Sequence, residues 1–201
     1  MSDEPGFDPV GALRRLVDEG VRFIVIGGFG ANLLGSPSVT YDLDVCYARD
    51  PENLEALARA LRGLRAKLRG APANVPFQLD AKALEMGDQF TFATSVGPLD
   101  IIGTPAGVDG FGDLDRTAHD MDLGGFTVRV AALEDLIRMK RAAGRPKDRI
   151  HLEVLGALRA VIDARATEQR EERRGRKTDG ALSVSGRRGR RRPGRPGSSS
   201  G

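Results

Sequence analysis

The feature that most constrains the fold is residues 22–47, where a glycine pair separates two strand-like segments. Residues 23–26 are a short apolar run, Phe-Ile-Val-Ile, that ends on Gly27 and Gly28. Such runs with β-branched residues predict a buried strand, and the glycines predict a tight turn after it. Helix-compatible residues 29–34 follow, and Gly-Ser-Pro-Ser at residues 35–38 interrupts the chain before a second strand.

The second strand carries two aspartates. Asp42 and Asp44 alternate with Leu43 and Val45, so the period of two places both carboxylates on one face. Aspartate is disfavoured in strands, and two on one face repel each other unless a cation lies between them. Mg²⁺, or Mn²⁺, bound by carboxylates and substrate phosphates explains the pattern, and the upstream glycines let a backbone approach phosphates closely. The alternative is a surface strand with two solvated aspartates.

A third carboxylate interrupts another apolar strand. Asp100 lies among Leu99, Ile101 and Ile102, and a buried carboxylate without a partner is costly. It therefore needs a metal, a neighbouring arginine, or a turn to cap before Gly103. Other aspartates, at positions 80 and 88, are weaker candidates because their surroundings are more polar.

The C-terminal folded part contains a lysine on an apolar helix face. Leu133, Leu136, Ile137 and Lys140 follow at i, i+3, i+4 and i+7, and Gly144 ends the predicted helix. A lysine in this position either extends to the rim of the core or meets an anion.

The order of strand, glycine pair, helix, loop and Asp-x-Asp strand resembles the nucleotidyltransferase superfamily, which includes DNA polymerase beta. The family's glycine pair matches Gly27-Gly28, and its metal-binding Asp-x-Asp matches Asp42-Leu43-Asp44. In this resemblance Asp100 takes the place of the third catalytic carboxylate, on a strand beside the Asp-x-Asp strand.

Residues 134–148 closely resemble the AbiEii-like branch, which includes toxins of toxin–antitoxin pairs. There a Glu-Asp-Leu-Ile-x-x-Lys helix precedes an Arg-Pro-Lys-Asp turn, and Lys140 takes the place of the lysine that holds the triphosphate. His151 stands where many relatives carry a further acid.

The resemblance implies an α/β (α+β) fold, a small mixed β-sheet covered by helices, with a C-terminal helical segment. The expected parts are a catalytic core at 1–130, a helical segment at 131–166 and a disordered basic tail at 167–201. The implied activity is metal-dependent transfer of a nucleoside monophosphate from NTP to an acceptor hydroxyl on RNA, such as tRNA, on protein or on a small alcohol, with an antitoxin as a further partner. The implied site comprises Asp42, Asp44 and Asp100 as catalytic and metal-binding residues, and Gly27, Gly28, Ser38, Thr40 and Lys140 as nucleotide-binding residues.

Two other classes remain open. A Rossmann-type dinucleotide-binding protein is suggested by Gly28-x-Gly30, but its fingerprint requires glycine or alanine at Leu33 and gives no reason for paired aspartates. A nucleotide-binding regulator of the nucleotidyltransferase fold would have lost turnover, although all three carboxylate candidates are present.

Composition limits compartment and partners. The single cysteine, Cys46, excludes an internal disulfide framework, and no apolar run is long enough to span a membrane. The N-terminus lacks the features of a signal peptide, which predicts a cytoplasmic protein. From Glu168 onward eleven Lys and Arg face four Asp and Glu, a charge of +7 that leaves −4 for the rest. This basic tail predicts binding to an anionic partner such as RNA, and the alternative is a solvated tail with no partner.

Overall fold

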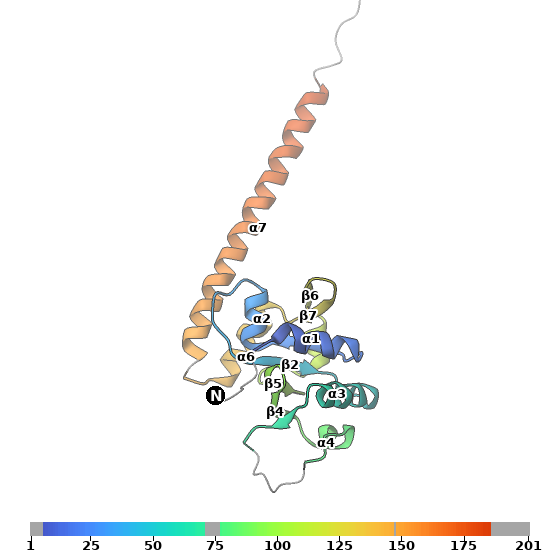
Figure 1. Ribbon diagram of the computed structural model, residues 1–201. Helices are drawn as coiled ribbons and strands as arrows, with labels where there is room; N and C mark the ends of the chain where they lie inside the picture. Colours follow the sequence, from blue (N-terminus) through green and yellow to red (C-terminus); the bar gives the residue numbers. More distant parts are fainter. Residues whose placement is uncertain (1–5, 71–76, 147, 186–201) are drawn as a thin grey trace, which may run out of the picture. The chain divides into compact units, whose positions relative to one another are not determined.

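The computed structural model describes residues 6–70, 77–146 and 148–185, with side chains through residue 169. The chain divides into two compact units, residues 1–159 and 160–201. Seven described strands of the first unit form one mixed sheet in the order β3-β4-β5-β2-β1-β7-β6 (Figure 1). The strands are β1 (Phe23–Ile26), β2 (Leu43–Tyr47), β3 (Lys67–Leu68), β4 (Gln89–Thr94), β5 (Gly97–Ile102), β6 (His119–Asp122) and β7 (Thr127–Val130).

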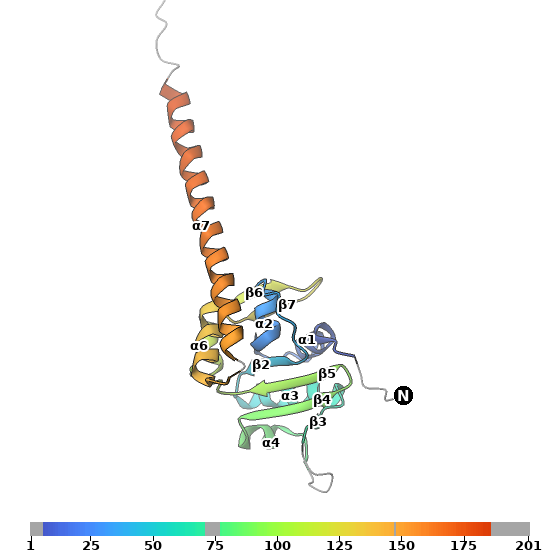
Figure 2. The ribbon, with the colours of Figure 1, turned by 90° about the vertical axis from the view of Figure 1, so that its left-hand side faces the viewer.

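Strand β2 lies at the centre of the sheet. It pairs antiparallel with β1, where Ile26 is opposite Asp44, and parallel with β5, where Asp44 is opposite Asp100. Figure 2 shows β3, β4 and β5 running side by side beyond it. This order places Ile26 of β1, Asp44 of β2 and Asp100 of β5 side by side, although they lie far apart in the sequence.

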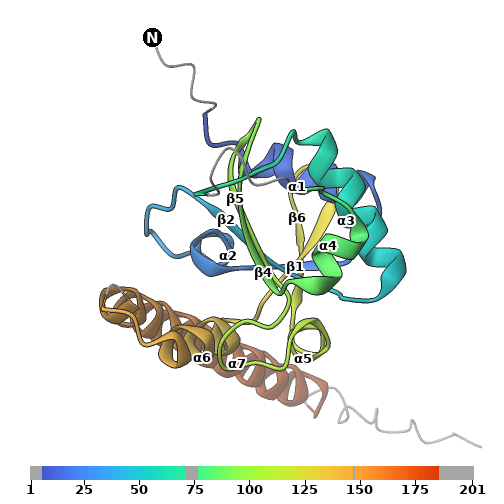
Figure 3. The same cartoon turned by 90° about the horizontal axis from the view of Figure 1, so that it is seen from below.

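Helices cover both faces of the sheet. Residues alternate along β1 and β2, so Val25 and Val45 join one apolar core while Ile24 and Cys46 join a second. Helices α1, α3 and α4 lie on one side of the sheet (Figure 3), and the second core includes side chains from α2, α6 and the start of α7. The helices are α1 (Pro9–Asp18), α2 (Gly27–Leu33), α3 (Pro51–Gly63), α4 (Ala81–Met86), α5 (Phe111–Asp115), α6 (Leu133–Ala143) and α7 (Asp148–Ser185).

Local sequence signals explain where several helices begin and end. Asp8 and Asp50 each precede a proline and accept a hydrogen bond from a backbone N–H of the first turn, at the starts of α1 and α3. Gly144 ends α6 in the left-handed conformation, with φ 60°. The predicted α/β class with a mixed sheet and a C-terminal helical segment is confirmed.

Three segments differ from the sequence-based expectation. Helical spacing predicts one helix up to Gly70, but α3 ends at Gly63 because Arg65 adopts φ 53°, and Leu68 pairs with β4 instead. The glycines of residues 107–113 predict a turn, but this stretch contains the start of α5. Helix α7 continues to Ser185 through residues expected to be disordered, and residues 186–201 of that tail lie outside the described part.

The predicted domain boundaries after residues 130 and 166 stay predictions. Among the described helices, none is both long enough and apolar enough to cross a membrane.

Candidate active site

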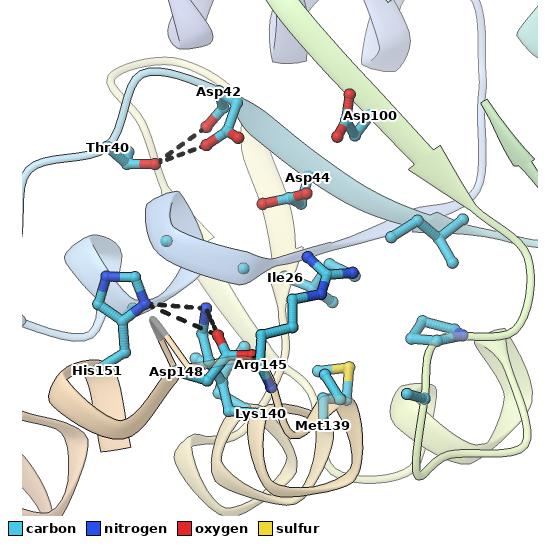
Figure 4. Close-up of a pocket in the computed structure, with 18 of the residues that line it drawn as sticks. Ile26, Thr40, Asp42, Asp44, Asp100, Met139, Lys140, Arg145, Asp148 and His151 are labelled. Carbon is cyan, nitrogen blue, oxygen red and sulfur yellow. Dashed lines mark hydrogen bonds and ion pairs between the residues drawn. The ribbon is translucent and has the colours of Figure 1, made fainter. Parts of the chain in front are cut away.

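One cavity of about 300 Å³ collects every residue of the site predicted from sequence. Its walls come from the ends of β1, β2 and β5, the start of α2, the loop before β2, and helices α6 and α7 (Figure 4). The predicted residues that line it are Gly27, Gly28, Ser38, Thr40, Asp42, Asp44, Asp100 and Lys140. The structure thus brings together residues that lie more than one hundred positions apart, and their roles remain predictions.

Three carboxylates form one wall. Asp44 and Asp100 occupy paired positions on neighbouring parallel strands, whose backbones lie about 4.8 Å apart. Asp42 precedes β2, and its Oδ1 accepts a hydrogen bond of 2.9 Å from Thr40 Oγ1. Figure 4 shows the three side chains together at the upper side of the cavity. A dense group of negative charges of this kind attracts a cation.

Asp100 carries the clearest electrostatic anomaly. Its Oδ1 is shielded from solvent and has no hydrogen-bond partner among the described residues. Burial raises the pKa of the Asp100 carboxyl above its ordinary value of 3.8, and the charge of Asp42 raises it further. A hydrogen bond with Thr91 and the charges of Arg69 and Arg145 oppose this rise. The unpartnered oxygen can therefore take a proton or a cation.

The two glycines at the start of α2 leave room for side chains from the facing loop and strand. Gly27 has φ +65°, and a Cβ placed there would lie 2.0 Å from Asp44 Oδ2. A Cβ on Gly28 would lie 2.6 Å from Thr40 Oγ1. The sequence suggests that the glycines admit phosphates, and the structure adds that they let the Asp44 and Thr40 side chains lie against the start of α2.

Opposite the carboxylates lies a cationic wall. Lys140 Nζ donates a 3.3 Å hydrogen bond to Asp148 Oδ1 and lies 3.3 Å from His151 Nδ1 (Figure 4). Asp148 Oδ2 also accepts a bond of 3.2 Å from the Arg145 backbone N–H. Burial alone would raise the pKa of Asp148, but the hydrogen bond and charge of Lys140 and the backbone and charge of Arg145 hold it below its usual value. Lys140 is thereby fixed in place.

Sequence reasoning did not place Arg145, Asp148 or His151 in this site, although all three line the cavity. A signal was available in the helical spacing of the residues that follow the Arg-Pro-Lys-Asp turn. Asp148, His151 and Leu155 follow at i, i+3 and i+7, so they share one face of α7, and Lys140 of α6 contacts the first two. His119, at the start of β6, does not line the cavity.

The donor set suits Mg²⁺ or Mn²⁺. Mg²⁺ usually takes one or two carboxylates and completes its shell with water and substrate phosphates. Asp42 and Asp44 supply such oxygens, and the unpartnered Oδ1 of Asp100 is a third. Within the described residues no three acidic, histidine or cysteine side chains are placed to hold an ion by themselves. Phosphate oxygens would therefore have to complete the shell.

Comparison with known proteins identifies the fold. No protein-family model and no curated protein matches the chain. Among solved structures, the lincomycin-bound lincosamide antibiotic adenylyltransferase LnuA matches with TM-score 0.50 and 12% identity, over 74% of this chain and 94% of that chain. TM1012 of Thermotoga maritima, described as a candidate nucleotidyltransferase, gives 0.48 and 17%, over 76% and 96%. The antibiotic-resistance factor ANT(2'')-Ia gives 0.44 and 14%, over 83% and 97%. The similarity to LnuA shows that the chain has a nucleotidyltransferase fold.

Proposed function

We propose that the protein transfers a nucleoside monophosphate from an NTP to an acceptor hydroxyl with the help of Mg²⁺ or Mn²⁺. One observation carries the proposal: Asp44 and Asp100 on two neighbouring strands, with Asp42 just before the first of them, line one cavity with Lys140 and Arg145. A cavity with separate acidic and basic walls suits a triphosphate that enters with a divalent cation. A dinucleotide oxidoreductase has no use for the carboxylate wall.

In this proposal Asp100 acts as general base. The acceptor oxygen forms a bond to the α-phosphorus while the bond from that phosphorus to the bridging oxygen breaks, and pyrophosphate leaves with the electron pair. The hydroxyl proton moves to Asp100 Oδ1, which has no hydrogen bond to lose. Its raised pKa makes the carboxylate a stronger base than an exposed aspartate.

The basic wall would hold the leaving group. Lys140 and Arg145 offset charge on the β- and γ-phosphates, and Asp148 keeps the ammonium group of Lys140 directed along the cavity wall. Ser38 adds a hydroxyl donor from the loop before β2, and Thr40, whose hydroxyl donates to Asp42 Oδ1, orients that carboxylate. A divalent ion, when bound to Asp42 and Asp44, would orient the phosphates and stabilise the leaving oxygen, which leaves Asp100 Oδ1 open for the proton.

The motif resemblance at residues 134–148 supports a narrower proposal for the acceptor and the biological role. In it the acceptor is an RNA hydroxyl, such as a tRNA end, and the protein is a toxin restrained by an antitoxin. LnuA was solved with lincomycin bound. The alternative acceptor to test is therefore a hydroxyl group of a small molecule. Growth arrest on expression, reversed by Asp44→Asn, would support the toxin role.

The test is transfer of label from each α-³²P NTP to total tRNA, to protein or to lincomycin, with pyrophosphate release measured in parallel. Asp44→Asn should abolish both signals and retain the fold. Asp18→Asn is the matched control because Asp18 is an exposed aspartate outside the cavity. NTP binding without transfer or pyrophosphate release would instead identify a nucleotide-binding regulator.

A further inference from the structure

We propose that the apolar end of the cavity holds the nucleobase of the NTP and that Gln89 selects among bases; this rests on the proposed nucleotidyl transfer. The end is defined by five side chains that continue the cavity beyond the carboxylates, from β5, the loop after it and α6. They are Ile102, Pro105, Ala106, Met139 and Ala143. Gln89 and Thr104 add the polar groups of this end.

The cavity is polarised along its length. Figure 4 shows His151, Lys140 and Asp148 on one side and the chain that follows β5 on the other, with the three aspartates above them and Arg145 between them. A triphosphate with its α-phosphorus at the carboxylates and its β- and γ-phosphates at Lys140 and Arg145 leaves the part of the cavity beyond Arg145 for its nucleoside. The apolar end lies in that direction, and a planar heteroaromatic ring is the part of an NTP that gains from an apolar wall.

The apolar end has a rigid outer wall. Asp88 Oδ2 accepts a 3.1 Å hydrogen bond from the Thr104 backbone N–H, and Asp88 Oδ1 accepts another of 3.1 Å from Thr104 Oγ1. Arg49 pairs with the same carboxylate at 3.1 Å, and the Gly103 N–H donates to the Asp88 carbonyl at 2.7 Å. These contacts fix the chain that carries Pro105 and Ala106. A preformed wall binds a rigid ring without the entropic cost of ordering a loop.

Gln89 is the group that can read the edge of the ring. It starts β4 opposite Ile102, and its side chain is exposed at the cavity. A primary amide both donates and accepts, so it can pair with complementary atoms on a base edge. The Thr104 hydroxyl, by contrast, is already engaged by Asp88.

The experiment measures binding of the α,β-methylene analogues of ATP, GTP, CTP and UTP, and of inorganic tripolyphosphate, by calorimetry with Mg²⁺. Ala106→Phe fills the apolar end from an exposed position. It should weaken the preferred analogue by about tenfold or more, and leave tripolyphosphate affinity within about twofold. Ala157→Phe, an exposed alanine of α7 outside the cavity, should change neither.

Gln89→Leu should reduce the ratio between the best and worst analogues by about threefold to tenfold, the value of one or two hydrogen bonds. Gln78→Leu, at an exposed glutamine outside the cavity, should keep the wild-type ratio. If wild type binds the analogues no better than tripolyphosphate, or if Ala106→Phe binds the preferred analogue as wild type does, the base does not occupy this end. If wild type binds no analogue and releases no pyrophosphate, the proposed function itself fails.

Discussion

Gly27→Ala tests whether the contact between α2 and Asp44 organises the site. Gly27 has φ +65°, which L side chains rarely adopt, and its added Cβ would lie 2.0 Å from Asp44 Oδ2 and 2.8 Å from Asp44 Cβ. The methyl group therefore carries two costs, backbone strain and a collision. Because both atoms belong to a short side chain on the central strand, Asp44 can relieve the collision only by leaving its rotamer or moving its strand.

The two costs can be separated with a matched control. Gly20 has φ +74°, but an added Cβ there meets nothing within 4 Å. Gly20→Ala should therefore lower the free energy of unfolding by the backbone cost alone, about 1–2 kcal/mol. Gly27→Ala should lose about 1–1.5 kcal/mol more for an off-rotamer Asp44. Each kcal/mol corresponds to about 2–4 °C in Tm for a domain of this size.

The assay combines thermal unfolding with label transfer. Displacement of Asp44 by about 1 Å should reduce transfer about a hundredfold in Gly27→Ala, and Gly20→Ala should retain wild-type transfer. Equal losses of stability in the two variants, together with undiminished transfer by Gly27→Ala, would refute the reasoning, because the collision would then have no consequence at the carboxylate.

Four further outcomes follow from the charged groups of the site and from the buried cysteine. The pKa of folded Asp100 is raised, so its contribution to stability is present below its ordinary pKa of 3.8 and is lost as pH rises through the raised value. At pH 7 in EDTA, the metal-free Asp100→Asn variant should therefore have a higher Tm than wild type. The same variant should have lost transfer. The pKa of Asp148 is lowered, so its contribution to stability is present above its ordinary pKa and is lost as pH falls through the lowered value. Asp148→Asn should therefore unfold with about 1.5–3 kcal/mol less free energy at pH 7 and converge on wild type in acid. Lys140→Met should lower the free energy of unfolding by a similar amount, because it leaves the Asp148 carboxylate buried without its ammonium partner. Calorimetry of this variant should also show weaker tripolyphosphate binding. Burial raises the pKa of the Cys46 thiol to about 12, so a thiol reagent should modify this single cysteine only at the rate of unfolding, and rapid labelling of the native protein would contradict the buried position.

Much of the fold could be predicted from the sequence because it follows from local periodicity. The apolar run of β1, the alternation around Asp42 and Asp44 and the Asp-Pro helix starts each predict structure over a few residues. The family resemblance supplied what periodicity cannot, the position of Asp100 on a strand beside β2, and the register pairs it with Asp44.

The remaining features depend on contacts that no local pattern encodes. Arg65 in a left-handed conformation ends α3 although the leucine spacing continues, because Leu68 can still contact the core from a strand. The pairing of Lys140 with Asp148 depends on how tightly the chain turns between α6 and α7. Sequence reasoning therefore predicted the acidic wall in full and one cation of the basic wall.

The central position of β2 has a consequence for how the site opens. The strands that carry Asp44 and Asp100 have hydrogen-bonded neighbours on both sides, so their amides should exchange with solvent only when the whole sheet unfolds. Lys140 lies on α6 and Asp148 on α7. These two helices can separate without breaking the hydrogen bonds between any two strands. In the proposed reaction, substrate would thus enter through a local fluctuation of α6 and α7 against a carboxylate framework that keeps its geometry.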